Sequence, residues 1–565
     1  MTDTPAKDAE AVSSRLVTAA PTPLEDLRSA VLEAAGELSG VERIRRGAIT
    51  LERPPRADFG DYSTNAALLL APGLGEPPRE VAERIGSVLA GRLGTSLERY
   101  EVAGPGFLNL FLSDAWLSGA LAAVLAAGEQ FGAGGAATGE RMLIEFVSAN
   151  PTGPMHVGHA RNAAYGDALG RVLTFRGHEV EREFYVNDAG SQVRKLGETI
   201  SALARGEPVP EDGYHGAYVE RLAESLGGDA SDPGKLGHAA VQVMVGQMQR
   251  SLAAFAVLDF DHWAYESALH EGDPSPVAHT LSLLEEQGCT YTSDGALWLR
   301  TTDFGDDKDR VLVRSSGEHT YFASDIAYHQ AKQERGFDRQ VDVWGADHHG
   351  YVSRMKAAYQ ALGGDPEHLE LLIMQLVHLV RSGERAQMSK RSGEFVTLDD
   401  LLEEIGVDAA RWYLLARSHD TTVDLDLDLA REQSSENPVY YVQYAHARIA
   451  SILAKAGTAR MRAAEDAADV QQRSEPMHAT ERALIEQLLA FPGELEEAAA
   501  RRAPHRITAY ALALAQDFTA FYRDCRVVGA EPEAVESMRI ALSVATQRTI
   551  ARCLQLLGVS APAEM

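Results

Sequence analysis

The chain has few cysteines and no long uncharged apolar run. Only three of its 565 residues are cysteine, at Cys289, Cys525 and Cys553, and they lie far apart with no CxxC pair. This spacing argues against a thiol-ligated zinc site and a disulfide framework, and it fits a reducing cytoplasm. No stretch approaches the apolar length that a membrane-spanning helix needs. We therefore expect a cytoplasmic protein without zinc or membrane segments.

Basic residues are also scarce relative to acidic ones. The sequence has 53 Lys and Arg against 82 Asp and Glu, for a formal net charge of −29. Taken alone, this balance speaks against a nucleic-acid partner, because phosphate contacts need basic side chains. However, arginines cluster at residues 43–56, 381–391 and 501–526, and an acidic chain can still present local positive faces. The net charge therefore leaves a nucleic-acid partner open.

The chain is long enough to form several domains. Residues 1–20 are polar, contain no secretory signal pattern, and are expected to form a flexible tail. Residues 21–125 predict a compact α/β module, with helices at 22–39 and 79–93, a strand at 48–52, and a strand–turn–strand pattern around Gly104-Pro105-Gly106. The Gly/Ala-rich run at 131–139 is typical of a linker.

The pattern changes at Arg141. Candidate strands at 141–147, 179–186, 341–346 and 371–380 alternate with helices, which indicates a parallel α/β sheet of Rossmann type within residues 126–400. Residues 196–285 interrupt the alternation and predict a helical insertion, and residues 295–323 predict antiparallel strands. After about Asp400 no strand is evident, so we expect residues 401–565 to form an all-α bundle. One helix face there carries Ile507, Tyr510, Leu514, Phe518 and Phe521.

One short run, SANPTGPMHVGHARN at residues 148–162, places an HxGH motif between a strand and a helix. In an open parallel sheet, the first strand-to-helix turn is the usual floor of a ligand site. A helix N-terminus there offers free N–H groups to a phosphate. His156 and His159 can add donors, and Gly158 lets an adenine ring approach the backbone. The alternative is a helix cap with incidental histidines.

A second motif, QMSKRSG at residues 387–393, follows the strand-like run LLIMQLVHLV. A lysine on a loop, here Lys390, can reach a triphosphate and stabilise the in-line displacement of pyrophosphate. A solvated basic loop is the default interpretation of such a segment when it stands alone.

Together, the two motifs resemble the HIGH and KMSKS signatures of class I aminoacyl-tRNA synthetases. Further segments are similar to arginyl-tRNA synthetases in particular, and the resemblance spans nearly the whole chain. They are FGDYSTNAAL, AGPGFLNLFLS, EFVSANPTGPMHVGHARN, YVNDAGSQ, TYFASDIAYH, WGADHHGYV, ENPVYYVQYAHARI and PHRITAYALALAQDFTAFYRDCRV. The resemblance implies an arginine–tRNA ligase that forms arginyl-adenylate from ATP and then charges tRNA-Arg.

The resemblance also implies an arginine pocket. A guanidinium is planar and needs carboxylates in fixed geometry. Glu145 and Asp325 match the pocket acids of the family, Tyr321 is positioned to order the guanidinium, and Asn150 to hold the α-amino end. Read without the motifs, Glu145 is a strand-end surface carboxylate, and Tyr321 and Asp325 serve packing and helix capping.

The ATP site implied by the resemblance includes both histidines, Gly158 and the loop residues Met388, Ser389 and Lys390. Asp347 and His348 are expected to hold the ribose and adenine. An aspartate beside tandem histidines could instead indicate a metal site, but no further ligand set at suitable spacing is visible. Mg²⁺ delivered with ATP is the expected ion.

The tRNA contacts are expected on the C-terminal helices. The tyrosines of the run at 440–444 pack as core or, alternatively, stack on unpaired anticodon bases. Arginines near this run and near residue 510 are candidates for phosphate contacts, although each taken singly fits a solvated helix face. These candidates are Arg448, Arg502, Arg506 and Arg523. In the family, the N-terminal module contacts the tRNA elbow and the bundle reads the anticodon.

The second signature departs from the family pattern, because Gln387 and Arg391 replace its first lysine and last serine. The lysine credited with phosphate stabilisation is present as Lys390. Some arginyl-tRNA synthetases lose that lysine and carry one three residues ahead of the HIGH motif instead. Here that position is Gly153, so Lys390 is expected to supply the cation.

Two other classes of protein fit parts of the sequence. One is a catalytically silent paralogue that only binds tRNA, which the intact His156, His159 and Lys390 argue against. The other is a class I ligase for cysteine or glutamate. The absence of a thiol-ligated zinc set in the sequence argues against a cysteine ligase. The acidic pocket candidates argue against a glutamate ligase, because a glutamate pocket would need cations. We expect a monomer that binds tRNA-Arg, L-arginine and ATP.

Overall fold

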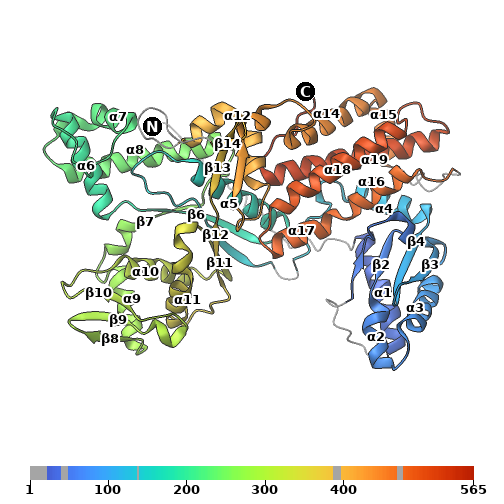
Figure 1. Ribbon diagram of the computed structural model, residues 1–565, viewed down its shortest axis with the longest axis horizontal. Coiled ribbons are helices and arrows are strands. Elements are labelled where there is room, and N and C mark those ends of the chain that lie inside the picture. The colour runs from blue at the N-terminus through green and yellow to red at the C-terminus, as the bar shows by residue number, and fades with distance from the viewer. Residues whose placement is uncertain (1–21, 40–48, 137–138, 386–395, 467–474) are drawn as a thin grey trace, which may run out of the picture.

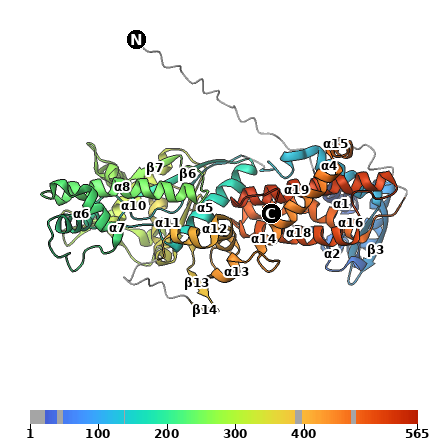
Figure 2. The same cartoon turned by 90° about the horizontal axis from the view of Figure 1, so that it is seen from above.

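The computed structural model describes residues 22–39, 49–136, 139–385, 396–466 and 475–565. A unit built on a parallel sheet lies at one end of the long axis, and a helical bundle extends to the other end with an N-terminal α/β module beneath it (Figure 1). Seen from above, the helices α6 to α8 lie farthest from that module (Figure 2). This arrangement confirms the predicted fold class.

The N-terminal module runs from α1 to α4. Its four-stranded antiparallel sheet has the order β1-β2-β4-β3. The helices α1, α2 and α3 pack on it around a core that includes Val31, Ile85 and Leu110. The elements are α1 (Pro23–Ser39), β1 (Leu51–Glu52), β2 (Tyr62–Thr64), α2 (Ala66–Leu74), α3 (Pro78–Leu93), β3 (Leu97–Ala103), β4 (Phe107–Leu112) and α4 (Asp114–Ala127). The predicted helices at 22–39 and 79–93 are thus α1 and α3.

The central sheet has five parallel strands in the order β12-β11-β5-β6-β7. They are β5 (Arg141–Glu145), β6 (Glu179–Val186), β7 (His262–Tyr265), β11 (Arg339–Gly345) and β12 (Leu369–Met374). The long helix α5 (Val157–Phe175) follows β5 and packs closely on its end, where a Cβ at Gly166 would come within 2.2 Å of Cγ of Phe146. Because β5 has β11 on one side and β6 on the other, α5 begins at the middle of the sheet's carboxyl edge.

The segment at 196–285 was expected to be a purely helical insertion, and that expectation was wrong in one respect. It contains α6 (Gly190–Ala204), α7 (Ala217–Leu226), α8 (Pro233–Ala254) and α9 (Pro276–Glu286), but also the edge strand β7. Four residues are too few to show a strand period. The antiparallel strands expected at 295–323 are present beside β8 (Thr290–Ser293) as β9 (Ala296–Leu299) and β10 (Arg310–Val313), and α10 (Tyr321–Glu334) and α11 (Val352–Ala361) flank the next strand.

The predicted strand at 371–380 is two strands in two different sheets. β12 ends at Met374, and β13 (Val377–Arg381) joins a small sheet with β14 (Glu384–Arg385) and β15 (Val423–Asp426). β15 lies beyond residue 400, where no strand was expected. Its sequence, VDLD, alternates over only four residues and is flanked by acidic residues, so it carried no clear strand signal.

The remaining chain is helical and forms the bundle. Its helices are α12 (Leu398–Leu415), α13 (Leu427–Arg431), α14 (Pro438–Ala456), α15 (Thr458–Glu465), α16 (Ala479–Leu489), α17 (Phe491–Ala500), α18 (His505–Asp524) and α19 (Glu533–Leu557). The predicted apolar face of α18 is confirmed, since all five of its residues are buried. Arg411 of α12 joins the bundle to α5 through a fully buried ion pair with Asp167.

Candidate active site

The HxGH motif forms the start of α5. His156 is the N-cap in an extended conformation, and its Nδ1 accepts a hydrogen bond from the backbone N–H of Gly158 at 3.1 Å. Nδ1 of His159 accepts one from the backbone N–H of His156 at 3.2 Å. The two rings are stacked, with centroids 3.7 Å apart. A Cβ at residue 158 would come within 2.9 Å of the His156 ring, so any larger residue there would have to displace that ring.

These contacts determine what the histidines can offer a ligand. Burial lowers the pKa of His156, and burial together with the neighbouring His156 lowers the pKa of His159 to about 3. Both rings are therefore neutral at pH 7. Because each Nδ1 accepts a backbone hydrogen bond, each neutral ring carries its proton on Nε2. The motif thus presents two N–H donors rather than two cations.

The chain returns to this turn directly after the second motif. Met388, Ser389 and Lys390 lie outside the described residues, which end at Arg385 and resume at Val396. Thr397 pairs with His156 in an isolated antiparallel bridge, and the backbone N–H of Leu398 donates to the carbonyl of Met155 at 2.8 Å. The end of the segment that carries QMSKR is therefore anchored on the HxGH turn.

Of the predicted arginine-pocket residues, the two acids are hydrogen-bonded; Glu145 is buried and Asp325 is half-buried. Oε1 of Glu145 accepts from the Ser148 hydroxyl at 2.7 Å, and its Oε2 is paired with Lys332. Asp325 lies on the first turns of α10 and accepts from the Tyr351 hydroxyl. Burial raises the pKa of both carboxyls, more than their neighbours lower it. Both side chains are thus fixed in place, and both favour a cationic neighbour.

The other two pocket candidates are open to solvent. Tyr321, the first residue of α10, is 60% exposed, and Asn150 is exposed in the connection between β5 and α5. Both stand at the carboxyl edge of the central sheet, where ligands bind in open α/β folds. Their side chains are therefore accessible to a ligand at that edge.

The structure adds acids that the sequence did not single out. Burial raises the pKa of Tyr185, and so do the negative charges of Glu266, Asp325, Glu145 and Asp188 around it. Glu266 directly follows β7, and burial plus the charges of Asp325 and Asp188 raises its pKa to about 7. Glu266 was missed because β7 was missed; a correctly placed strand would have put this acid at the carboxyl edge.

Asp188, whose role the sequence left open, has a structural contact. Its two carboxylate oxygens accept from the backbone N–H and the hydroxyl of Ser267, at 2.8 and 2.7 Å. This fixes the segment that carries Glu266. The charges of four carboxylates thus act together on Tyr185, and this excess of negative charge favours a cationic ligand.

Asp347 and His348 lie in a short 3₁₀ helix (Ala346–Tyr351) directly after β11. Their side chains are 83% and 53% exposed, and His348 Nε2 is 3.3 Å from Asp347 Oδ2. They share the carboxyl edge of the sheet with the start of α5. Among the described residues, no group of three or more His, Cys, Asp or Glu side chains is arranged to hold a metal ion.

The predicted tRNA-contacting arginines differ in how they are engaged. Arg502 makes two 2.8 Å contacts with Glu370 of β12, and Arg506 pairs with Glu494 at 2.8 Å. Both therefore tie elements of the protein together.

The other two arginines lie on exposed surfaces. Arg523 pairs with the adjacent Asp524 on an exposed turn. Arg448 lies over the rings of Tyr444 and Tyr522, each 40% exposed, and Tyr444 is stacked against Tyr440. This second group is an exposed aromatic and cationic surface of the bundle.

No helix of the described residues has the length and apolar character needed to cross a membrane.

Comparisons with known proteins agree with this geometry. The model of the "tRNA synthetases class I (R), catalytic domain" matches residues 120–206 and 238–451, that of the "Arginyl tRNA synthetase N terminal domain" matches 25–112, and that of the "DALR anticodon binding domain" matches 442–565. A parallel sheet with an HxGH turn, continued by a helical bundle, defines a class I aminoacyl-tRNA synthetase.

Relatives of similar length narrow the class. The arginine–tRNA ligase of Geobacillus thermodenitrificans is 43% identical over 558 residues, covering 96% of this chain and 99% of the relative. That of Bacillus subtilis is 43% identical over 557 residues, covering 96% and 98%. The solved Thermus thermophilus arginyl-tRNA synthetase superposes with a TM-score of 0.75 at 25% identity, covering 96% and 99%. The chain belongs to the arginyl-tRNA synthetase family.

Proposed function

We propose that this chain is an arginine–tRNA ligase. It activates L-arginine with ATP to arginyl-adenylate, releases pyrophosphate, and transfers the arginyl group to the 3′-terminal ribose of tRNA-Arg. The observation that carries this proposal is that the negative charges of Glu145, Asp188, Glu266 and Asp325 all act on Tyr185, near the sheet edge where the HxGH turn starts α5. An acidic, partly buried site matches the guanidinium of arginine, because buried carboxylates need a cationic partner.

The histidines are assigned to the phosphates of ATP. Two preorganised Nε2–H donors, together with the N-terminus of α5, favour the charge that develops on the transferring α-phosphate and on departing pyrophosphate. Gly158 faces the adenine, and Asp347 and His348 hold the nucleoside part. Met388, Ser389 and Lys390 of the second motif are assigned to the triphosphate, with Lys390 as its cation. Mg²⁺ enters on the phosphates of ATP.

The amino acid is held on the opposite side of the reacting atoms. Glu145 and Asp325 take the guanidinium, Tyr321 covers it, and Asn150 binds the α-amino end. This positions the arginine carboxylate for attack on the α-phosphate without a covalent enzyme intermediate. Lysine has a compact ammonium rather than a planar fork, so a pocket built on two carboxylates discriminates against it.

The tRNA is assigned to the remaining parts. We place the elbow on the N-terminal module within residues 21–125, the chemistry in residues 126–400, and the anticodon on residues 401–565. The exposed Arg523 and the half-buried Arg448, which lies beside two exposed tyrosines, serve phosphate contacts. Arg502 and Arg506 reach phosphates only after leaving Glu370 and Glu494. We further propose a cytoplasmic monomer, which sedimentation at working concentration tests.

The decisive experiment is arginine-dependent ATP–pyrophosphate exchange, measured with and without tRNA-Arg. Exchange with arginine and not with lysine supports the proposal. We expect it only when tRNA-Arg is present. No exchange in either condition contradicts the proposed activity, and exchange without tRNA contradicts only the coupling to tRNA.

A further inference from the structure

Three carboxylates lie side by side across three neighbouring strands of the central sheet. Asp342 of β11 is in register with Glu145 of β5, and Glu145 is in register with Glu183 of β6. Residues in register on neighbouring strands project to the same face of a sheet. Their exposed fractions are 0%, 6% and 0%, so the row is buried. Buried carboxylates in such a row must be compensated.

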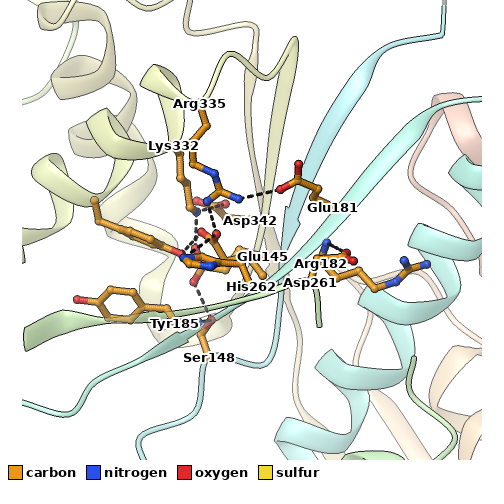
Figure 3. A network of polar contacts seen from close by, with 12 residues as sticks. Glu145, Ser148, Glu181, Arg182, Tyr185, Asp261, His262, Lys332, Arg335 and Asp342 are labelled. Carbon is orange, nitrogen blue, oxygen red and sulfur yellow. Dashed lines mark hydrogen bonds and ion pairs between the residues drawn. The ribbon is translucent and has the colours of Figure 1, made fainter. Parts of the chain in front are cut away.

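Two cations compensate the row, Lys332 of α10 and Arg335, which directly follows that helix; Figure 3 shows Lys332 beside Glu145 and Asp342, and Arg335 reaching toward Glu181. Lys332, which is fully buried, pairs with Glu145 and lies 2.8 Å from Asp342. Arg335, one turn further, pairs with Glu183 and with the neighbouring Glu181. Lys332 is therefore shared by two acids, and one of them is the predicted guanidinium ligand.

The other contacts of these two acids are different. Asp342 Oδ2 contacts His329 Nε2 at 2.8 Å, whereas Oε1 of Glu145 accepts the neutral Ser148 hydroxyl. Lys332 and His329 lower the pKa of Asp342 to about 2 despite its burial, whereas burial and the charge of Asp342 raise that of Glu145. Asp342 is thus the well-compensated acid and Glu145 the poorly compensated one.

We propose that Lys332 is a positioning residue for the arginine substrate. Shared between Glu145 and Asp342, it keeps the Glu145 carboxylate ionised and fixed, yet leaves it enough negative charge to pair with the guanidinium. Asp342 also contributes to this positioning, because it competes with Glu145 for the ammonium group of Lys332. This inference rests on the proposed function, and it assigns roles to two residues that touch neither ATP nor arginine.

Charged and titratable groups face Glu145 from every packed element, and they define the pH behaviour. They are Lys332, His329, Asp325 and Tyr328 of α10, Asp342 of β11, and Glu183 and Tyr185 of β6. Lys332 and the Ser148 hydroxyl lower the pKa of Glu145, and Asp342 raises it. Removing Lys332 therefore raises this pKa further, and Glu145 is then protonated at a pH at which it is ionised in the parent enzyme.

The test measures KM for arginine, KM for ATP and kcat in tRNA charging for four proteins: the parent, Lys332→Met, Asp342→Asn and the double variant. In Asp342→Asn, Lys332 pairs with Glu145 alone and neutralises more of its charge. We therefore expect about a tenfold rise in KM for arginine, with KM for ATP unchanged. Lys332→Met should also raise KM for arginine, most strongly at low pH and progressively less between about pH 6 and pH 9. The parent should show no such trend.

The double variant separates this role from a merely structural one. With Lys332 gone, Asp342→Asn removes a like charge beside Glu145, so it should lower KM for arginine instead of raising it. A structural role gives the same sign in both backgrounds. Arg335→Met is the matched control, because it breaks an ion pair of the same row, from the residue that directly follows α10, and the ion pairs of Arg335 are with Glu183 and Glu181 rather than with Glu145. It should leave the arginine pH trend of the parent unchanged.

Each outcome decides. The proposal is supported when Asp342→Asn raises KM for arginine in the parent and lowers it in Lys332→Met. It is overturned when the change has the same direction in both proteins or when KM does not change. Should Lys332→Met fail to fold by circular dichroism, the isosteric Asp342→Asn decides by its selectivity: a rise in KM for arginine with KM for ATP unchanged supports the proposal, and an equal change in both or in neither overturns it. A parent enzyme that does not charge arginine overturns the proposed function, whereas normal charging with unaffected variants overturns only the role of Lys332.

Discussion

His156 and Thr397 pair in an isolated antiparallel bridge, which joins the cap of α5 to the cap of α12. The side chain of Thr397 accepts a hydrogen bond from the backbone N–H of Asp400 and so starts α12, while His156 starts α5 in the same way. Two helix caps, far apart in sequence, therefore form one structural unit. The QMSKR segment ends within a few residues of it.

From this anchoring we predict that Lys390→Ala lowers arginine activation by ~100-fold or more, the effect of losing one preorganised charge partner. The measurement is tRNA-dependent ATP–pyrophosphate exchange. Arg385→Ala is the matched control, since Arg385 is an exposed cation before the same segment and lies 3.7 Å from Asp424. Near-normal exchange in Lys390→Ala means that another cation serves the phosphates.

A second variant tests whether the position of the cation matters. A Cβ at residue 153 would meet nothing closer than 3.6 Å, at the Tyr218 hydroxyl. A side chain is therefore accommodated there, and Gly153→Lys places a lysine three residues before the HxGH motif. We expect it to restore part of the exchange lost in Lys390→Ala and to change the parent by less than about threefold. An unrestored double variant argues that the loop itself is required.

His159 predicts a pH dependence of stability. Its pKa is lowered from 6.5 to about 3 in the folded protein. The unfolded chain takes up a proton below about pH 6.5 and the folded protein does not, so stability falls as pH decreases through this range. His159→Asn keeps an acceptor for the His156 N–H but removes the titration. Urea unfolding at about pH 7.5 and pH 5 should show a smaller acid loss in the variant, by up to ~2 kcal/mol; equal losses contradict the buried neutral ring.

For Glu486, at the contact between α16 and the N-terminal module, we predict that stability falls as pH rises. Its pKa is raised to about 8 by burial and by Asp61, although Arg53 lies 2.9 Å away. A raised carboxyl pKa contributes stability fully below the unfolded value and loses it as pH rises through about 8. Raising the pH from 7 to about 9 should therefore loosen the module.

The readout is limited proteolysis of the module at both pH values. Glu486→Gln should make the cleavage rate insensitive to pH in this range. Glu497→Gln, which alters an exposed pair with Arg501, is the control and should behave like the parent. The idea fails when the parent shows no change of cleavage rate with pH.

We predict that alanine substitution has opposite effects on the free energy of unfolding at two helical glycines, Gly197 and Gly119. A Cβ at Gly197 of α6 would come within 1.8 Å of the Pro233 carbonyl, so Gly197→Ala must push α6 away from α8. We expect a loss of about 1–3 kcal/mol. Gly119 of α4 has nothing within 4 Å of such a Cβ, and Gly119→Ala should stabilise by up to ~1 kcal/mol. Thermal unfolding of both variants checks the contrast, and equal shifts contradict it.

Much of the fold follows from local patterns. The apolar spacing of α18 was predictable because its period repeats along the helix, and the four longer strands of the central sheet were predictable because each has five or more residues. The strand predicted at 371–380 nevertheless merged β12 with β13 of another sheet. β7 and β15 were not predictable, since four residues cannot show a period and their pairing partners lie far away in sequence. Missing β7 also hid Glu266, which is an ordinary acidic residue until its strand is known.

The site was predictable in proportion to its motifs. The HxGH turn lies at a strand-to-helix junction as expected, and its geometry is now specified to the tautomer. Lys332 could not be predicted, because a lysine near the end of an amphipathic helix reads as a solvated side chain. Only the register of β11, β5 and β6 shows that buried carboxylates lie next to this lysine. Arg502 is a similar case, since its partner Glu370 lies on a distant strand.

The acidic row also limits how this pocket can be redesigned. Replacing Glu145 alone with a neutral residue removes the proposed guanidinium ligand, but it also leaves Lys332 buried with Asp342 as its remaining carboxylate partner. A neutral or anionic amino acid would then bind next to the buried Lys332–Asp342 ion pair and not in a neutral pocket. New substrate specificity therefore requires coordinated changes in β11, β5 and α10, beneath the residues that contact the substrate.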